Sequence, residues 1–119
     1  MYRLLVLALA VIWPLTAAGA FYTGKDLLDW CDGTNVGEPR DSVDLYNTCV
    51  VYLAGVIDTD ETISGWGYKS GHVCPPKGVT LEHMRHVWLR YARENPNKLR
   101  LLGAHSALIA FSQSWPCKQ

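Results

Sequence analysis

Four cysteines are the residues of this chain with the widest scope for chemistry, and they are Cys31, Cys49, Cys74 and Cys117. A cysteine can attack a substrate, bind a metal ion or form a disulfide, depending on its surroundings. Zinc is one alternative, because the sequence also contains His72-x-Cys74 followed by His83-x-x-His86. The sequence has no C-x-x-C pair, so we favour disulfides over a metal site.

Catalytic motifs are missing from the sequence. It has no G-x-S-x-G, no H-E-x-x-H and no glycine-rich loop of the phosphate-binding kind. Asp58, Asp60 and Glu61 lie close together, and we interpret them as the solvated end of a helix. We interpret His86 as a residue of a solvated helix face and His105 as a partly buried, hydrogen-bonded histidine. We therefore expect no catalytic residue, no cofactor and no metal, and the chain is predicted not to be an enzyme.

The first twenty residues have the pattern of a secretory signal peptide. One basic residue, Arg3, precedes an uninterrupted apolar run from Leu4 to Trp13, and Ala18-Gly19-Ala20 supplies small residues before a cleavage point. The run is shorter than the ~20 residues that a transmembrane helix needs. We predict a signal peptide over residues 1–20 and a mature, exported domain over residues 21–119, with no membrane anchor after cleavage.

Apolar residues recur at helical spacing in four segments, and no segment has the alternation of a convincing strand. The predicted helices cover approximately residues 25–31, 41–57, 81–94 and 101–114. Thr23 and Thr80 are suited to cap the first and third helices, and Gly33 to end the first. Residues 58–77 are expected to be irregular, and Gly55 to allow close approach of another helix. The fold class is therefore all-α, a small disulfide-linked bundle of about four helices.

Export favours disulfides, because the exported compartment is oxidising and the number of cysteines is even. Four cysteines allow three pairings. If the first two helices pack antiparallel, the end of the first, with Cys31, lies near the start of the second, with Cys49. Cys74, before the third helix, and Cys117, after the fourth, meet at one pole of the bundle. We therefore predict the disulfides Cys31–Cys49 and Cys74–Cys117.

Charge and composition limit the classes of partner. The 11 Lys and Arg residues balance 11 Asp and Glu residues, which argues against a nucleic-acid partner because such proteins carry a basic excess. A hydrophobic content of 49% excludes a disordered chain. A small exported helical domain without catalytic groups is expected to act by binding.

The order and spacing of several motifs resemble one protein family. The motifs are Asp26-Leu27-Leu28-x-x-Cys31, Cys49-x-x-Tyr52-Leu53-x-Gly55, Cys74-x-Pro76-x-Gly78-Val79-Thr80, Tyr91-x-x-Glu94-Asn95-Pro96 and Trp115-Pro116-Cys117. Together they resemble the Rap/Tai immunity proteins, which protect Gram-negative bacteria against amidase effectors of type VI secretion. Two features depart from that family: the segment 58–72 is long, and Gly103-Ala104 stands where Pro-Ala is expected.

The resemblance implies a periplasmic, helical, disulfide-bonded protein that often forms a homodimer. Its partner would be a peptidoglycan amidase, whose cysteine–histidine active site it blocks. Two alternatives come from other classes: a periplasmic stress chaperone, and an inhibitor of another cell-wall hydrolase such as a lysozyme. Four cysteines in disulfides and only four histidines do not favour a chaperone that responds to acid.

Trp66, Tyr68, Lys69 and His72 are the residues that we predict to contact the partner. They lie in the long irregular segment, and a blocking protein needs an element that enters an enzyme cleft. Trp and Tyr are frequent hot spots of interfaces, and Lys69 and His72 would add polar contacts at the rim. A second interpretation places Trp66 on the helices as a cover of the core.

Overall fold

The computed structural model describes residues 21–33, 39–67 and 72–118. It contains the helices α1 (Gly24–Asp32), α2 (Pro39–Gly65), α3 (Leu81–Glu94) and α4 (Gly103–Ser114), with a 3-10 helix η1 (Pro96–Lys98) between the last two. Within these residues there is no strand, so the all-α fold class is confirmed. None of the described helices combines the length and apolar character that a membrane span requires.

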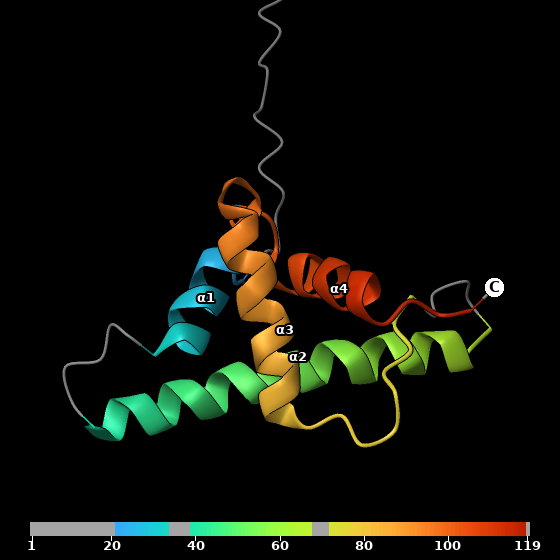
Figure 1. Cartoon of the computed structure of the whole chain (residues 1–119), viewed down its shortest axis with the longest axis horizontal. Coiled ribbons are helices and arrows are strands. Elements are labelled where there is room, and N and C mark those ends of the chain that lie inside the picture. Colours follow the sequence, from blue (N-terminus) through green and yellow to red (C-terminus); the bar gives the residue numbers. More distant parts are fainter. Residues whose placement is uncertain (1–20, 34–38, 68–71, 119) are drawn as a thin grey trace, which may run out of the picture.

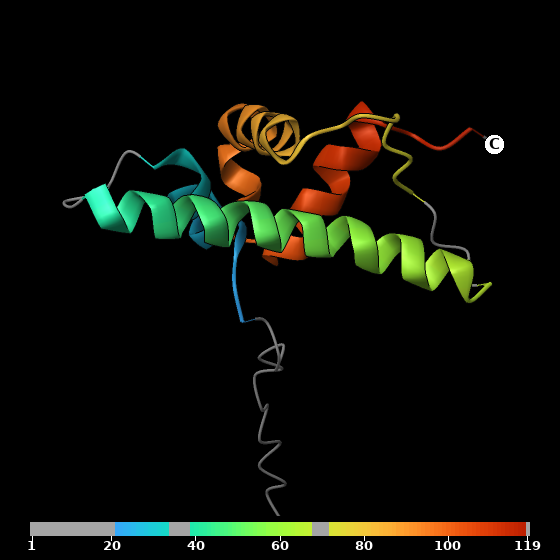
Figure 2. The same ribbon diagram turned by 90° about the horizontal axis from the view of Figure 1, so that it is seen from below.

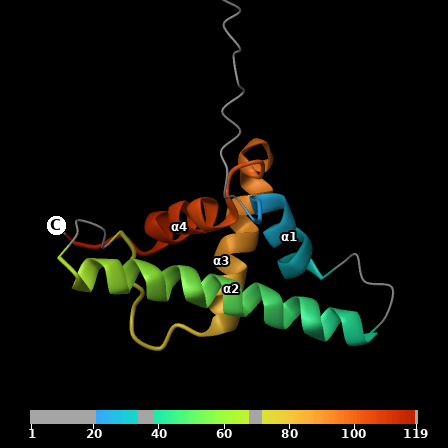
Figure 3. The ribbon, with the colours of Figure 1, turned by 180° about the vertical axis from the view of Figure 1, so that it is seen from behind.

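The long helix α2 is the base on which the other helices are assembled. It has 27 residues, and α1, α3 and α4 all lie on one side of it (Figure 2). Helix α3 crosses α2, with α1 on one side of it and α4 on the other (Figure 1). Seen from behind, α2 runs across the whole assembly (Figure 3). The opposite side of α2 is therefore left without a helical neighbour in the described fold.

Each helix contributes one large side chain to the centre of the core. Leu27 of α1, Leu53 of α2, Trp88 of α3 and Phe111 of α4 are all 0% exposed. Trp115, just after α4, stacks on Phe111 with ring centroids 5.6 Å apart. Truncation of aromatic residues in such positions costs about 3–5 kcal/mol, so this junction carries much of the stability.

Local capping sets the start of α1 and α3. The Thr23 hydroxyl accepts from the Asp26 N–H, and the Thr23 N–H donates to the Asp26 carboxylate at 2.8 Å, which completes a capping box. This backbone hydrogen bond lowers the pKa of Asp26. The Thr80 hydroxyl accepts from the His83 N–H at 3.1 Å. Gly33, with a left-handed φ of 64°, ends α1, so the predicted caps are confirmed.

Helix α2 is longer than the sequence pattern indicates. Residues 58–65 belong to it, so the expectation that this segment is irregular is wrong. The sequence from Asp58 to Ser64 contains neither proline nor glycine, and nothing in it stops a helix. The hydroxyls of Thr59 and Thr62 donate to carbonyls of the preceding turn, each at 2.7 Å. Gly67, with φ of 84°, follows the end of the helix in a conformation that favours glycine.

Two disulfides close the fold, and they join the predicted pairs. Cys31–Cys49 ties α1 to α2, and Cys74–Cys117 ties the segment before α3 to the segment after α4. The loops that they close span 18 and 43 residues, for which chain entropy predicts about 3 and about 4 kcal/mol of stabilisation. The Cys74 N–H also donates to the Trp115 carbonyl at 2.8 Å, which aligns the two segments.

The start of the described chain is held against the start of α4. The Gly24 N–H donates to the Leu101 carbonyl, and the Gly103 N–H donates to the Tyr22 carbonyl, both at 2.9 Å. A Cβ at Gly103 would lie 3.0 Å from the Tyr52 hydroxyl and 3.1 Å from the Thr23 carbonyl oxygen. This crowding is the physical reason for glycine at position 103, where the resemblance led us to expect proline.

Candidate protein-binding surface

A groove of about 620 Å³ lies between α2 and α4. Most of the side chains that line it are apolar or small. From α2 they are Val51, Tyr52, Gly55, Val56, Thr59, Asp60 and Ile63, and from α4 and its entry Leu102, Ala104, His105 and Leu108, with His72 at one end. The groove is therefore a mainly apolar channel, with Asp60 and His72 at one end.

Two further hollows continue this groove along α2. One shares Val51 and Tyr52 with it and extends to Tyr22 and Trp30. The other shares Gly55, Thr59 and Ile63 with it and extends to Trp66. We call the three hollows together the α2 trough. It follows the helix from the aromatic residues near α1 to the last turn of α2.

The trough exposes apolar side chains that a folded chain usually buries. Val51 is 69% exposed and Trp66 is 71% exposed, while Tyr22 and Leu102 are also among the exposed large hydrophobic residues. On α2 itself, Val51, Gly55, Thr59 and Ile63 recur at four-residue spacing and so share one face. The core-facing residues of α2 lie on a different face, so this helix is apolar on two sides. An apolar strip that no part of the described fold covers is typical of a binding surface.

The end of the trough near α1 is an aromatic cluster. Tyr22, Trp30 and Tyr52 meet edge to face, with ring centroids 4.9, 5.8 and 6.4 Å apart. Burial raises the pKa of the Tyr52 phenol above its ordinary value of 10. Packed aromatic rings hold their side chains in place and lower the entropy cost of binding.

The opposite end of the trough carries a buried carboxylate. Asp60 is only 5% exposed, and its Oδ2 accepts from the Val73 N–H at 3.2 Å. Its Oδ1 lies 3.6 Å from Nδ1 of His72. The interpretation of Asp60 as part of a solvated helix end is therefore wrong. Asp60 lies within α2 and connects it to the segment that precedes Cys74.

Gly55 lies at the middle of the trough, and no other element of the described residues packs against it. A Cβ built on Gly55 would meet no atom within 4 Å. The expectation that another helix of the chain approaches it is therefore wrong. A glycine inside a helix costs about 1 kcal/mol relative to alanine, and the described fold offers no packing reason for this cost.

The structure describes two of the four residues that were predicted to contact the partner. Trp66 is exposed, so the interpretation that it covers the core is wrong. His72 is exposed at the mouth of the trough beside Asp60. Tyr68 and Lys69 lie outside the described residues, and their role stays a prediction.

His105, expected to be partly buried, is exposed on the α4 side of the trough, because the adjoining face of α2 leaves the space beside it open.

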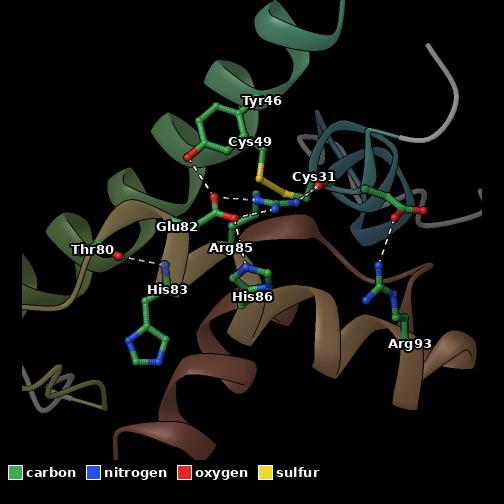
Figure 4. A network of polar contacts seen from close by, with 10 residues as sticks. Cys31, Tyr46, Cys49, Thr80, Glu82, His83, Arg85, His86 and Arg93 are labelled. Carbon is green, nitrogen blue, oxygen red and sulfur yellow. Dashed lines mark hydrogen bonds and ion pairs between the residues drawn. A yellow bond between two sulfur atoms is a disulfide. The ribbon is translucent and has the colours of Figure 1, made fainter.

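A polar network surrounds the Cys31–Cys49 disulfide, away from the trough (Figure 4). Glu82 accepts from Arg85 at 2.6 and 3.0 Å and from the Tyr46 hydroxyl at 2.9 Å, and it lies 3.0 Å from Nε2 of His86. Arg85 also donates to the Cys31 carbonyl at 2.7 Å. The hydrogen bonds from Arg85 lower the pKa of Glu82 to about 2. The network joins α1, α2 and α3, and we assign it a structural role.

The residues that suggested zinc are used in other ways. Cys74 is in a disulfide, His86 pairs with Glu82, and the His83 ring packs edge-on against Trp115 at 5.5 Å. Among the residues that the structure describes, no group of three or more His, Cys, Asp or Glu side chains is placed to hold a metal ion.

Fold and trough together define a small, disulfide-linked all-α domain with an apolar surface suited to contact another protein. The family model of the Rap1a immunity proteins matches residues 23–117, which include all four helices and both disulfides. The chain belongs to the Rap1a immunity protein family, as the sequence motifs indicated. No curated protein and no solved structure gave a match. Membership of an immunity family implies that the partner is an effector protein.

The trough itself was not predicted from the sequence, although two signals for it are present. The first is the second apolar stripe of α2, with Val51, Gly55 and Ile63 at four-residue multiples. The second is the aromatic triplet Tyr22, Trp30 and Tyr52, whose members come together only in the folded chain. The stripe was obscured because the helix was expected to end before Ile63.

Proposed function

We propose that this chain is a periplasmic immunity protein that binds and blocks a peptidoglycan amidase delivered by type VI secretion. The observation that carries the proposal is the match to the Rap1a immunity proteins over residues 23–117. The amidase as target and the periplasm as place of action come from the resemblance of the sequence motifs to the Rap/Tai group.

The rigidity of the fold supports an inhibitory role. Two disulfides and a core centred on Trp88 and Phe111 hold the scaffold in one conformation. A protein that blocks an enzyme gains affinity when its contact surface is organised before binding, because less entropy is lost on association. The exposed Trp66, just after α2, offers a large apolar side chain next to such a scaffold.

We propose residues 66–72 as the element that approaches the amidase cleft. Trp66 and His72 border the trough at its polar end. Tyr68 and Lys69 lie between them in the sequence and would add contacts to the same region. A projecting segment on a rigid helical scaffold is a common way to enter a concave active site.

Export through a signal peptide over residues 1–20 is part of the proposal. Cleavage after Ala20 would leave Phe21, which is 88% exposed, as the first residue. Two residues further on, the Thr23 side chain caps α1. Cleavage would retain Thr23 and every later residue of the described fold, and the oxidising periplasm would maintain both disulfides.

The direct test uses protein purified from the periplasm and the peptidoglycan amidases encoded in the same genome. Titration calorimetry should show binding to one of them with a Kd in the nanomolar range, and the inhibitor should stop its cleavage of purified peptidoglycan. Co-expression should rescue cells that receive this amidase in the periplasm. Light scattering of the free protein would show whether it forms the homodimer that the resemblance implies. Inhibition of a lysozyme with no binding to any amidase would contradict the proposal.

A further inference from the structure

The α2 trough has no occupant in the described fold, and its features define what could fill it. Its walls are apolar along most of their length, with Val51 and Ile63 on α2 and Leu108 on α4. Its length follows several turns of α2, from the Tyr22 cluster to Trp66. An occupant must therefore be an elongated apolar segment, such as one face of a helix.

Gly55 determines how closely such a segment can approach. It lies midway along the trough, between Val51 and Thr59 on the same helix face, and the space above it is open to 4 Å and beyond. Glycine at a helix crossing lets two backbones approach more closely than any side chain permits. Since no part of the described fold uses this space, the close approach is available to another protein.

The charge around the trough is acidic. Residues 41–65 contain five Asp and Glu residues and no Lys or Arg. Of these, Asp58 and Asp60 line the trough, whereas Glu61 lines a different hollow on another face of α2. Among the described residues that line the trough, none is a Lys or an Arg.

Asp60 adds a specific site for a cation. The hydrogen bond from Val73 engages Oδ2, while the contact of Oδ1 with His72 is longer, at 3.6 Å. The carboxylate is buried and faces the groove, so a basic side chain from an occupant would form a charge-assisted hydrogen bond there. A two-fold related copy of this chain would instead bring its own Asp58 and Asp60 to the same surface, and this repulsion disfavours a symmetric dimer there.

We propose that the α2 trough binds an apolar segment of the effector that carries a Lys or Arg side chain, with Gly55 as the point of closest approach and Asp60 as the partner of the cation. This inference rests on the proposed function and specifies the surface and the chemistry of the contact. It adds a second contact region to residues 66–72, continuous with them through Trp66 and Ile63.

The test replaces Gly55 by leucine, whose Cβ would meet no atom within 4 Å and whose side chain would extend into the trough. Because leucine favours helix more than glycine does, Gly55→Leu should have a melting temperature equal to or above that of the unmodified protein. Its Kd for the catalytically inactive amidase should rise at least about 30-fold, since the segment loses its closest contact. Gln113→Leu places the same side chain on an exposed position of α4 outside the trough and should leave the Kd unchanged.

The role of the Asp60 carboxylate as partner of the cation is tested with the variant Asp60→Asn. This variant retains an oxygen acceptor for the Val73 N–H. We expect the Kd for the same amidase to rise about tenfold, and the salt dependence of binding to weaken. Glu94→Gln removes one negative charge from the exposed face of α3 and should leave both quantities unchanged.

The outcomes separate this inference from the proposed function. If the unmodified protein binds the amidase and both trough variants bind equally well, the inference is overturned and the function stands. If Gly55→Leu converts a dimer into a monomer and leaves amidase binding intact, a second copy occupies the trough and the inference is also overturned. If the unmodified protein binds no amidase, the proposed function fails, and this inference fails with it.

Discussion

The carboxylate of Asp60, inside α2, accepts a hydrogen bond from the backbone N–H of Val73 at 3.2 Å. Val73 precedes Cys74, so this bond positions the segment that the Cys74–Cys117 disulfide joins to the end of α4. The same carboxylate closes one end of the α2 trough. One side chain thus connects the stability of the fold with the surface proposed for binding.

Replacing Asp60 by alanine should destabilise the protein by about 1–3 kcal/mol. The change leaves the buried N–H of Val73 without its acceptor, and an unpaired buried donor costs its full desolvation energy. Asp60→Asn should cost less, because the amide oxygen can accept the same hydrogen bond. Urea unfolding of both variants measures the difference, and equal stability of the alanine variant and the unmodified protein would contradict the structural role of this bond.

Glu82 should make stability depend on pH in the acid range. Its pKa is about 2 in the folded protein, below its ordinary value of 4.5, because Arg85 donates to it. A lowered folded-state pKa adds stability that is complete above about pH 4.5 and is lost as the pH falls through about 2. Because the side chain is 44% exposed, we expect Glu82→Gln to cost only about 1 kcal/mol at pH 7.

Measuring unfolding at several pH values, with a control variant, tests this prediction. The stability difference between Glu82→Gln and the unmodified protein should shrink as unfolding is measured at pH 7, 4 and 2. Glu94→Gln, on the same helix and without this network, should show no such convergence. A constant difference at all three pH values would mean that the ion pair is not the source of the effect.

The two disulfides should contribute unequally to stability. The Cys74–Cys117 bond closes a loop of 43 residues and the Cys31–Cys49 bond one of 18 residues. Serine variants of each pair should therefore lose about 4 and about 3 kcal/mol, respectively, less any strain in the native bonds. Thiol titration of the unfolded, unreduced protein should detect no free cysteine, and peptide mapping should recover these two pairs. A mapped bond between Cys31 and Cys74 would overturn the pairing.

Trp66→Ala should separate binding from stability. Trp66 is exposed at the end of α2, so the change should alter the free energy of unfolding by no more than about 0.5 kcal/mol. If Trp66 contacts the amidase, the binding free energy should weaken by about 2 kcal/mol or more, as expected for a hot spot. Leu81→Ala removes another exposed apolar side chain outside the trough and should leave binding unchanged. Full inhibition by a stable Trp66→Ala variant would place the contact elsewhere.

The features that the sequence predicted correctly depend on interactions between near neighbours. Thr23 and Thr80 cap their helices through residues three positions along the chain, and Asn95-Pro96 stops α3 because proline disfavours helix in the residue before it. The disulfide pairs were predicted from the order of the helices, although Cys49 lies well inside α2 and not near its start as expected.

Other features required the tertiary structure, because they depend on which elements face one another. The sequence shows that Asp60 is acidic and Gly55 flexible, but burial of the first and open space beside the second arise from the packing of residues 72–74 and α4 against α2. The exposure of His105 also depends on the tertiary structure, because His105 lines the open trough between α4 and α2. Helical periodicity identifies apolar faces, whereas only the assembled fold decides which of two apolar faces of α2 is covered by the core and which is left for a partner.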